Sequence, residues 1–503
     1  MFKSALDYHN HTSYDRYNMQ GHYMDWPNQP TVFKQYSGIE PIPLVPGDNP
    51  KKVSIAQLCL TEPTGRKDST SIYYSLLSDI LTLTHAITAK AKHGGSYFYY
   101  RSVASAGALY PFESYVCALG VEGLDPGLFH HNLAANGLEK LVDGASISRI
   151  RDILNLENTI RPSLVFFLTS IFFRSSWKYR DRAYRYHLLD TGHLLENLTL
   201  ALKYKELEYS IVTDFDDDKT NGFLGIDPKR EVCLVAVCVG SCNEVDQTET
   251  SSSNKPVVDL SSFSKVSERE ITYSVIEEIH QLTRSNRTEP DFNTDRIGDL
   301  GLELRFVGSV DSLEIPEESL KYPDAVFARR SLRNFVKKEL SLNEIGYMLR
   351  VLGASEAITG ASSEGVQIGF IASNVQKAPK GFYIYNPDSH SLFLARQDSI
   401  MDEMTHICLD QGWLSNCAAH FLMLVNMTDI ERRFGPRGYR RALLTAGRLG
   451  QRLYLTTTSL KLGCCGIGAF YDAEARKLLG LNEHSRLTYL LGVGPLKKRS
   501  INE

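Results

Sequence analysis

The sequence lacks the compositional marks of several protein classes. Its 55 basic and 59 acidic side chains give a net charge of −4, so bulk electrostatics favour neither nucleic acid nor an anionic membrane as a partner. The apolar runs are all shorter than the ~20 residues that a membrane-spanning helix needs, and the N-terminus shows no apolar signal segment. These absences predict a cytoplasmic protein that binds neither nucleic acid nor membrane.

The cysteines do not form the sequence patterns that are typical of disulfide frameworks or zinc sites. The nine cysteines are odd in number, include no CxxC pair and mostly occupy apolar, strand-like runs. This usage indicates reduced thiols rather than a disulfide framework or a zinc site. The adjacent Cys464 and Cys465 are either buried or redox-active. His187, Asp190 and His193 lie three apart and could imitate a metal site, but no further ligand accompanies them, and we expect no metal.

A long internal repeat is the main feature that the sequence does contain. Residues 177–202, WKYRDRAYRYHLLDTGHLLENLTLAL, return as residues 432–457, RRFGPRGYRRALLTAGRLGQRLYLTT. Tyr184 and Tyr439 are 255 positions apart, and the same spacing places the apolar run SLVFFLTS over AAHFLMLV. A repeat of this length exceeds any solenoid unit, so we predict the duplication of a whole domain.

The patterns around the repeat predict two domains of one α+β fold, because strand candidates alternate with long helices. We expect the first domain, with an irregular N-terminal arm, over residues 1–245, a Ser-rich linker over residues 246–270, and the second domain over residues 271–503. Gly192 and Gly447 lie in the middle of the copied helices, where glycine costs about 1 kcal/mol relative to alanine. Close approach of the two helices would offset that cost, so the two domains are expected to form an intramolecular pseudo-dimer.

The two copies differ in the segments that could bind a ligand. Only the first half contains YRSVASAGALYPFESY, whose small residues let backbone amides approach a flat or anionic ligand. Only the second half contains ARRSLRNF, whose arginines suit a phosphate monoester, although such a run alone is usually a solvated basic patch. GCCGIGAFYDAEARKLLGL, near the C-terminus, predicts a glycine-rich turn that leads into a helix.

Together with YHNHTSYDR, FKQYSG and LLGVGPLK, these segments resemble those of the nitroreductase-like flavoproteins. Among them the resemblance is to the SagB-type dehydrogenases, which include azoline oxidases that act on thiazole- and oxazole-containing peptides. It covers almost the whole chain, in two copies. The resemblance implies two tandem nitroreductase-like domains with FMN at the interface between them.

The resemblance also implies roles for individual residues. The arginine-rich segment and a C-terminal lysine would hold the FMN phosphate, the glycine-rich segment would line the flavin beside N5, and the first-half loop would reach the same flavin. These three groups are Arg329, Arg330, Ser331, Arg333 and Lys497; Gly466, Ile467 and Gly468; and Ser105, Ala106 and Gly107. One composite FMN site per chain would then remain after the duplication.

A Lys-Tyr pair at this place is associated with catalysis in azoline oxidases. Here Lys178 and Tyr179 occur only in the first half, because the second half has Arg433 and Phe434. A tyrosine whose pKa is lowered by a neighbouring ammonium could remove a C–H proton while hydride passes to flavin N5. Tyr110 is a candidate for lining the same pocket. The alternative is that the lysine and the tyrosine merely cover the start of a helix.

These residues predict an FMN-dependent oxidoreductase that dehydrogenates a peptide or peptide-like substrate of the azoline type in natural-product maturation, with oxygen or another acceptor reoxidising the flavin. Two other functions stay open. One is an NAD(P)H-dependent nitroreductase or quinone reductase, and the other is a non-catalytic, flavin-containing scaffold that binds a peptide. An internal pseudo-dimer needs no second chain, so a monomer is expected, without further dimerisation being excluded.

Overall fold

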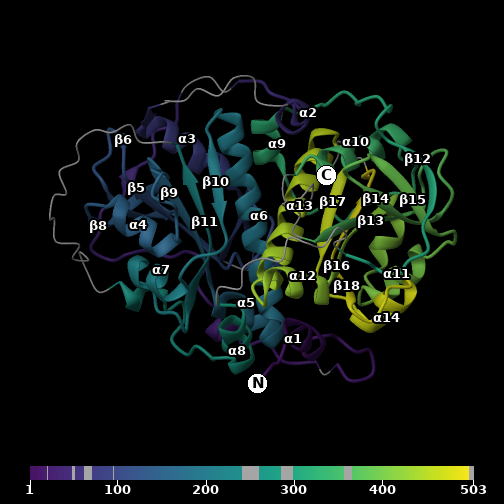
Figure 1. Ribbon diagram of the computed structural model, residues 1–503, viewed down its shortest axis with the longest axis horizontal. Helices are drawn as coiled ribbons and strands as arrows, with labels where there is room; N and C mark the ends of the chain where they lie inside the picture. The colour runs from purple at the N-terminus through teal and green to yellow at the C-terminus, as the bar shows by residue number, and fades with distance from the viewer. Residues whose placement is uncertain are drawn as a thin grey trace. The chain divides into compact units, whose positions relative to one another are not determined.

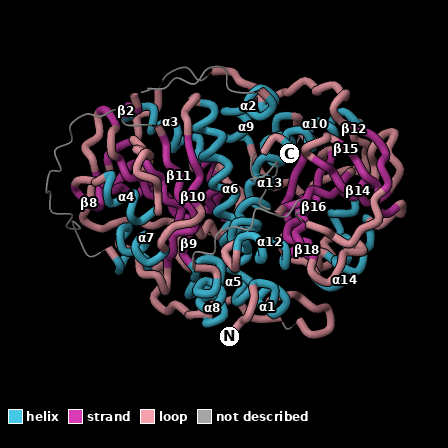
Figure 2. Tube along the Cα trace, viewed as in Figure 1, coloured by secondary structure: helices cyan, strands magenta, loops and turns pink. Residues whose placement is uncertain are grey.

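The computed structural model describes residues 1–19, 21–47, 51–61, 71–93, 96–240, 260–284, 298–355 and 365–497. The chain divides into two compact units. The N-terminal unit comprises Tyr23–Lys51 and Pro63–Asn286, and the C-terminal unit comprises Met1–His22, Lys52–Glu62 and Arg287–Glu503. Each unit is built on one seven-stranded sheet with helices packed against it (Figure 1 and Figure 2).

The sheet of the N-terminal unit is antiparallel throughout its described strands. Its spatial order is β1 (Ile42–Pro43), β8 (Gly137–Asp143), β7 (Gly127–Asn132), β5 (Phe112–Ala118), β9 (Leu164–Ile171), β11 (Glu231–Val239) and β10 (Tyr209–Val212). β5, β9 and β11 are buried along their whole length, which explains their continuous apolar sequences. Two short pairs lie outside this sheet: β2 (Ile72–Tyr73) with β6 (Val121–Glu122), and β3 (Ile87–His93) with β4 (Ser96–Arg101).

Helices cover both faces of this sheet. They are α3 (Tyr74–Thr84), α4 (Ile147–Leu154), α5 (Phe172–Tyr179), α6 (Ala183–Tyr204), α7 (Asp217–Leu224) and α8 (Ser274–Leu282). Ile150 of α4 and Leu224 of α7 share a core with Phe167 of β9. On the other face, His187 of α6 contacts Ser170 of β9. Side chains three apart on a strand point to opposite faces, so the sheet lies between α6 on one side and α4 and α7 on the other.

The C-terminal unit repeats this plan. Its sheet order is β12 (Arg305–Ser309), β15 (Ser391–Arg396), β14 (Gly381–Asn386), β13 (Val366–Ala372), β16 (Ala419–Asn426), β18 (Ser485–Gly494) and β17 (Gly463–Ile467). Its helices are α1 (Ala5–His11), α2 (Ile55–Leu60), α9 (Tyr322–Ala328), α10 (Leu342–Gly353), α11 (Met401–Ile407), α12 (Met427–Phe434), α13 (Gly438–Ser459) and α14 (Asp472–Leu478). Met404 of α11 and Ala475 of α14 share one core with Leu422 of β16.

The predicted duplication of an α+β domain is confirmed. α6 and α13 each contain 22 residues and begin 255 positions apart, at Ala183 and Gly438. The strands that precede them, β9 and β16, begin at the same spacing, and the two sheets match strand by strand in spatial order. The pairing of the two domains into a pseudo-dimer stays a prediction.

The N-terminal arm differs from the irregular segment that was expected. It contains two helices, α1 and α2, and each begins with a capping box, formed by Ser4 with Asp7 and by Ser54 with Gln57. Both helices belong to the C-terminal unit, not to the domain predicted over residues 1–245. Helices of 7 and 6 residues are too short to show a clear apolar periodicity, so the sequence did not reveal them.

The predicted linker and domain boundary also differ from the observed division. Residues 241–259 lie outside the described residues. Leu260 is buried in the core of the N-terminal unit, and Val266 is buried as well. α8 follows in the same unit, where a ring nitrogen of His280 lies 3.3 Å from the Tyr184 hydroxyl oxygen. The N-terminal unit therefore extends beyond residue 270.

The glycine-rich segment near the C-terminus is a strand and not a turn. Gly463–Ile467 forms β17, the edge strand that pairs with β18. A Cβ atom at Gly466 would collide with the Tyr489 hydroxyl, which explains a glycine at that position. Across the described ranges, no helix combines the length and the apolar composition needed to cross a membrane.

Candidate functional site

A strained loop lies between β4 and β5 in the N-terminal unit. Gly107, Ala108 and Tyr110 have φ angles of +64°, +53° and +45°. This left-handed region suits glycine, but it costs energy for alanine and tyrosine, so the surrounding structure must hold the loop in place. Three of the residues predicted to contact a ligand, Ser105, Ala106 and Gly107, lie in this loop.

Asp190 of α6 binds the start of this loop. Its Oδ2 accepts a hydrogen bond from the Ser105 hydroxyl at 2.6 Å, and both of its carboxylate oxygens lie 3.1 Å from the Ala106 amide nitrogen. The Ser105 hydroxyl oxygen accepts in turn from the Tyr110 amide at 2.9 Å. Burial raises the pKa of Asp190 to about 7, although the bonds from Ser105 and Ala106 act in the opposite direction.

The raised pKa of Asp190 predicts a pH-dependent stability difference between the wild type and Asp190→Asn. A carboxyl whose pKa is higher in the folded than in the unfolded state stabilises the fold fully below about pH 4, and this stability is lost as the pH rises through about 7. Asparagine does not titrate, so the wild type should lose up to about 4 kcal/mol relative to the variant between pH 4 and pH 8. Urea unfolding across this pH range measures the free energy of unfolding of both proteins. A difference between them that does not change with pH would contradict the raised pKa of Asp190.

The predicted catalytic pair lies directly beside this loop. Lys178 and Tyr179 end α5, and the chain then turns through Arg180, whose φ of +50° separates α5 from α6. The Lys178 Nζ lies 5.4 Å from the centroid of the Tyr179 ring. A Cβ atom at Gly107 would lie 2.8 Å from the Tyr179 hydroxyl oxygen and 3.2 Å from the Lys178 Nζ. The backbone conformation therefore favours glycine at position 107, and a side chain there would have to displace the ends of Tyr179 and Lys178.

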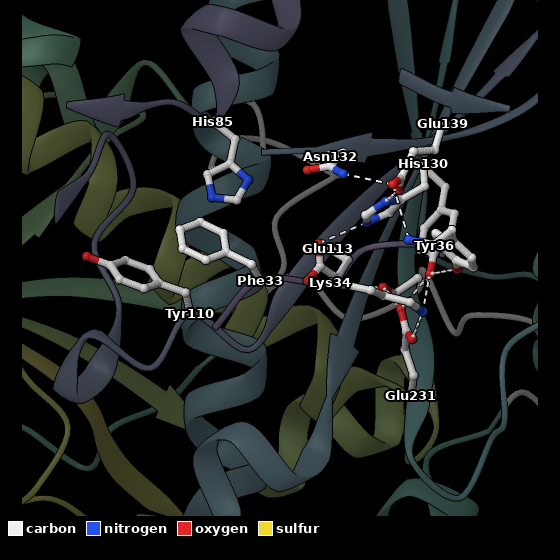
Figure 3. A network of polar contacts seen from close by, with 12 residues as sticks. Phe33, Lys34, Tyr36, His85, Tyr110, Glu113, His130, Asn132, Glu139 and Glu231 are labelled. Carbon is white, nitrogen blue, oxygen red and sulfur yellow. Dashed lines mark hydrogen bonds and ion pairs between the residues drawn. The ribbon is translucent and has the colours of Figure 1, made fainter. Parts of the chain in front are cut away.

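Tyr110 lies to one side of a buried network of charged and polar groups (Figure 3). The Arg101 guanidinium lies 4.3 Å from the centroid of the Tyr110 ring, and Arg174 donates to the Tyr110 carbonyl oxygen at 3.1 Å. Arg174 also forms a 2.6 Å ion pair with Glu113. Burial alone would raise the pKa of Glu113, but the Arg174 guanidinium and the His130 ring hold it below its usual range. The sheet thus fixes the loop from below through Arg174.

The same network continues to a fully buried ion pair. The His130 ring lies between Glu113, at 3.1 Å, and Glu139, at 2.9 Å. Beyond them the Lys34 Nζ lies 2.5 Å from the Glu231 carboxylate, and both side chains are at most 1 % exposed. Lys34 belongs to the segment before the first strand, so this pair ties that segment to the sheet.

The second group of predicted residues lies in the C-terminal unit. The segment after α9 runs beside β17, because the Leu332 amide donates to the Cys464 carbonyl oxygen at 3.0 Å. The same segment also pairs with residues near the C-terminus, where the Lys497 amide donates to the Asn334 carbonyl oxygen at 2.9 Å. This arrangement brings Arg329, Ser331, Arg333 and Lys497 to the β17 edge of the sheet, the edge that carries Gly466 and Ile467.

Tyr454 of α13 links these residues. Its hydroxyl lies 2.9 Å from the Ser331 hydroxyl oxygen and accepts from the Gly466 amide at 2.7 Å. The Arg329 guanidinium lies 5.4 Å from the centroid of the Tyr454 ring. The Arg333 guanidinium lies over the Trp413 ring, at 5.6 Å. The donors on this edge, guanidinium and hydroxyl groups, are those that a phosphate monoester binds.

Arg330 has a different surrounding from the other two arginines. Its Nη1 donates to the carbonyl oxygens of Phe327, at 3.0 Å, and Arg329, at 2.7 Å. These carbonyls lie at the C-terminal end of α9, where a cation is a favourable partner.

The residues considered as a metal site and as a redox pair have the following surroundings. The described residues contain no group of three His, Cys, Asp or Glu side chains arranged to hold a metal ion. The His187 Nδ1 lies 2.7 Å from the Ser170 hydroxyl oxygen. Cys464 and Cys465 are both 2 % exposed, and burial raises the pKa of each thiol, which favours the buried over the redox-active interpretation.

Sequence reasoning did not foresee the roles of Asp190, Arg174 and Tyr454 at these sites. The comparison of the two copies contained one usable signal, because Asp190 corresponds to Thr445 at the 255-residue spacing. An acidic residue in only the copy that has the loop indicates a role tied to the loop.

The comparisons with known proteins fit this architecture. The model of the nitroreductase family matches this chain twice, over residues 76–241 and 326–495, with one segment in each half. The chain belongs to the nitroreductase family. A crystal structure of a protein from Anabaena variabilis, described as a nitroreductase, covers 99 % of this chain and is itself covered completely, with a TM-score of 0.78 and 23 % identity. At that identity the likeness shows the tandem nitroreductase fold.

Three relatives are similar to parts of this nitroreductase-family chain. MJ1384 of Methanocaldococcus jannaschii, named as a nitroreductase, is 26 % identical over 194 residues, 37 % of this chain and 98 % of its own length. The trifolitoxin-processing protein TfxB of Rhizobium leguminosarum bv. trifolii is 29 % identical over 28 % of this chain and 39 % of its own length. The microcin B17-processing protein McbC of Escherichia coli is 25 % identical over 29 % and 55 %. The match therefore spans less than two thirds of either processing protein.

Proposed function

We propose that this chain is an FMN-dependent, SagB-type oxidoreductase that dehydrogenates an azoline ring in a peptide or peptide-like substrate. The observation that carries the proposal is the Lys178–Tyr179 pair held against the Ser105–Gly107 loop in the N-terminal unit. The similarity to two processing proteins, TfxB and McbC, supports a peptide substrate. The second copy has Arg433 and Phe434 at the positions of the pair, so only one unit carries this chemistry.

The donor groups of the C-terminal unit fit FMN as the cofactor. Arg329, Ser331 and Arg333 would hold its phosphate, with Lys497 beside them, because guanidinium and ammonium groups complement a phosphate dianion. Gly466 and Ile467 of β17 lie on the same edge and, with the adjacent Gly468, are proposed to line the isoalloxazine. When bound, FMN would supply a two-electron acceptor for hydride. The composite nature of the site, with the loop of the first half contributing, stays a prediction from the sequence.

The side chains of the pair would handle the proton. Converting an azoline to an azole removes one proton and one hydride from adjacent ring atoms. In the proposal, the Tyr179 oxygen takes the proton from the substrate C–H bond, and the Lys178 ammonium stabilises the phenolate before the transfer. The loop restricts where a ring can approach the Tyr179 hydroxyl, because Gly107 lies directly against it. Tyr110 is proposed to line the substrate pocket.

The first test is the flavin content of the purified chain. One FMN per chain is expected, together with oxidation of azoline peptides that can be followed by absorbance. Rapid bleaching by NAD(P)H with turnover of small aromatic acceptors, and no azoline oxidation, would favour the nitroreductase or quinone-reductase alternative. A bound flavin without any turnover would favour the scaffold. Two FMN per chain would contradict a single composite site. A chain that binds no FMN even after reconstitution would contradict the hypothesis of an FMN-dependent enzyme.

We predict that Arg329→Ala combined with Arg333→Ala weakens FMN binding. Each charge-assisted bond to phosphate contributes roughly 1.5–3 kcal/mol, so the dissociation constant should rise at least about 100-fold. Fluorescence titration of the stripped protein with FMN measures it. The control is Arg305→Ala, because Arg305 is exposed on β12, the opposite edge strand of the same sheet. Equal affinities of both variants would show that the phosphate binds elsewhere.

A further inference from the structure

Asp190 is a buried carboxylate that the proposed chemistry leaves without a role. It lies in the middle of α6 and is only 3 % exposed. Its described hydrogen bonds are those that it accepts from the Ser105 hydroxyl and from the Ala106 amide. The described residues include no cationic partner of Asp190, and burying a carboxylate without one costs free energy, so its place in α6 needs a reason other than stability.

The loop that Asp190 binds requires an external anchor. Ala108 and Tyr110 have positive φ angles, a conformation that non-glycine residues adopt only when their surroundings enforce it. The Ser105 hydroxyl donates to Asp190 and accepts from the Tyr110 amide at 2.9 Å, so one side chain connects the carboxylate to the far end of the loop. Both groups that face the carboxylate, the Ser105 hydroxyl and the Ala106 amide, are donors, so the Asp190 oxygens serve here as acceptors.

The anchored loop in turn lies directly against the proposed catalytic pair. Gly107 lies one residue beyond Ala106, and a Cβ atom there would be 2.8 Å from the Tyr179 hydroxyl oxygen and 3.2 Å from the Lys178 Nζ. In the second copy Thr445 replaces Asp190, and the same copy lacks the lysine and the tyrosine. The carboxylate and the pair are thus present in one unit and absent together in the other.

We propose that Asp190 is a positioning residue, which holds the Ser105–Gly107 loop against Lys178 and Tyr179. The inference rests on the proposed function for the reaction that it serves, but the anchoring itself is a property of the N-terminal unit. A loop displaced by about 1 Å is enough to lower turnover about 100-fold when a reacting group depends on it.

Four variants of the full chain test this proposal. Asp190→Ala removes the anchor, and Asp190→Asn keeps the shape but replaces one acceptor by a donor. Ser105→Ala keeps the bond from the Ala106 amide to Asp190 and removes the connection to Tyr110. Thr191→Val is the matched control, because Thr191 is the next residue of α6, is fully buried and has a hydroxyl without a hydrogen-bond partner in the part of the chain that the structure describes.

Two measurements are made on each variant. Hydrogen exchange of the peptide that covers residues 102–110 reports on the loop without any substrate. We expect faster exchange in both Asp190 variants and unchanged exchange in Thr191→Val; Ser105→Ala should speed exchange at the Tyr110 end only. Azoline-peptide turnover should fall about 10- to 100-fold in kcat for Asp190→Ala, with KM within about threefold of the wild type and the thermal midpoint not lowered.

The outcomes separate the two proposals. Unchanged exchange over residues 102–110 in Asp190→Ala would overturn the anchoring role. A kcat loss that only follows a loss of folded protein would overturn the positioning role, because a purely structural residue lowers both together. If the wild type oxidises no azoline peptide, the proposed function fails, while the exchange data still decide whether Asp190 holds the loop.

Discussion

Replacing Tyr179 by phenylalanine is expected to abolish most of the turnover of an azoline peptide. General-base catalysis by a positioned side chain contributes about 10²–10⁴-fold, so kcat should fall by that factor. The ring of phenylalanine preserves the packing against Tyr186, whose ring centroid lies 4.4 Å away. Folding should therefore be unaffected, and steady-state kinetics together with a thermal midpoint measure both effects.

The second copy supplies the control for this prediction. Phe434 occupies the position that corresponds to Tyr179, at the end of α12, so the fold accepts phenylalanine there. Phe434→Tyr adds the same hydroxyl to the other unit and should leave kcat unchanged. It should also fail to restore turnover when combined with Tyr179→Phe. Full activity of Tyr179→Phe would remove the tyrosine from the mechanism and leave the covering of a helix start as its role.

Replacing Lys34 by methionine is expected to give the largest loss of stability. The substitution leaves the Glu231 carboxylate fully buried without its cation, and breaking a buried pair from one side costs about 3–5 kcal/mol. The loss extends to neighbouring groups, because Lys34 also donates to the Tyr115 hydroxyl oxygen at 2.7 Å and Glu231 accepts from the Ser264 hydroxyl at 2.8 Å. Urea unfolding at neutral pH measures the change.

Two further variants separate the charge effect from the loss of packing. Lys34→Met combined with Glu231→Gln removes both charges and should recover part of the stability, because no unpaired charge remains. Lys51→Met breaks an ion pair of similar length, 2.7 Å to Glu206, in which both side chains are more than half exposed. This control should cost less than about 1 kcal/mol. Equal losses in Lys34→Met and Lys51→Met would show that burial does not set the strength of the pair.

The buried network belongs to one unit alone, although the two sheets have the same strand order. At matching strand positions, Glu113, His130 and Glu139 correspond to Gln367, Ile384 and Phe393. Glu231, the first residue of β11, corresponds to Ser485, the first residue of β18. The C-terminal unit thus fills the same positions with apolar or neutral side chains. The unit that carries the network is also the one in which Arg174 supports the loop at Tyr110.

The duplicated fold could be predicted from sequence because its signals are local and repeated. The 255-residue register places α6 on α13 and β9 on β16, and a register that holds across strand and helix leaves little freedom for another fold. Composition alone also picked out the two segments proposed to bind the ligand, since the small residues at Ser105–Gly107 and the arginines after Ala328 are contiguous in the chain. Contiguity makes such groups visible without a structure.

Only the tertiary structure could decide how distant groups meet. Asp190 is 85 positions from Ser105, and Lys34 is 197 positions from Glu231, so no local pattern records either contact. The helices of the N-terminal arm and the course of α8 within the N-terminal unit also depend on surfaces that form when the chain folds back on itself. Long-range packing selects these partners because burying a charge or a strained loop is tolerated only where a distant group satisfies it. The sequence therefore specifies the repeated scaffold and the residue types on which the proposed chemistry depends, while folding determines which carboxylate binds the loop beside the proposed catalytic pair.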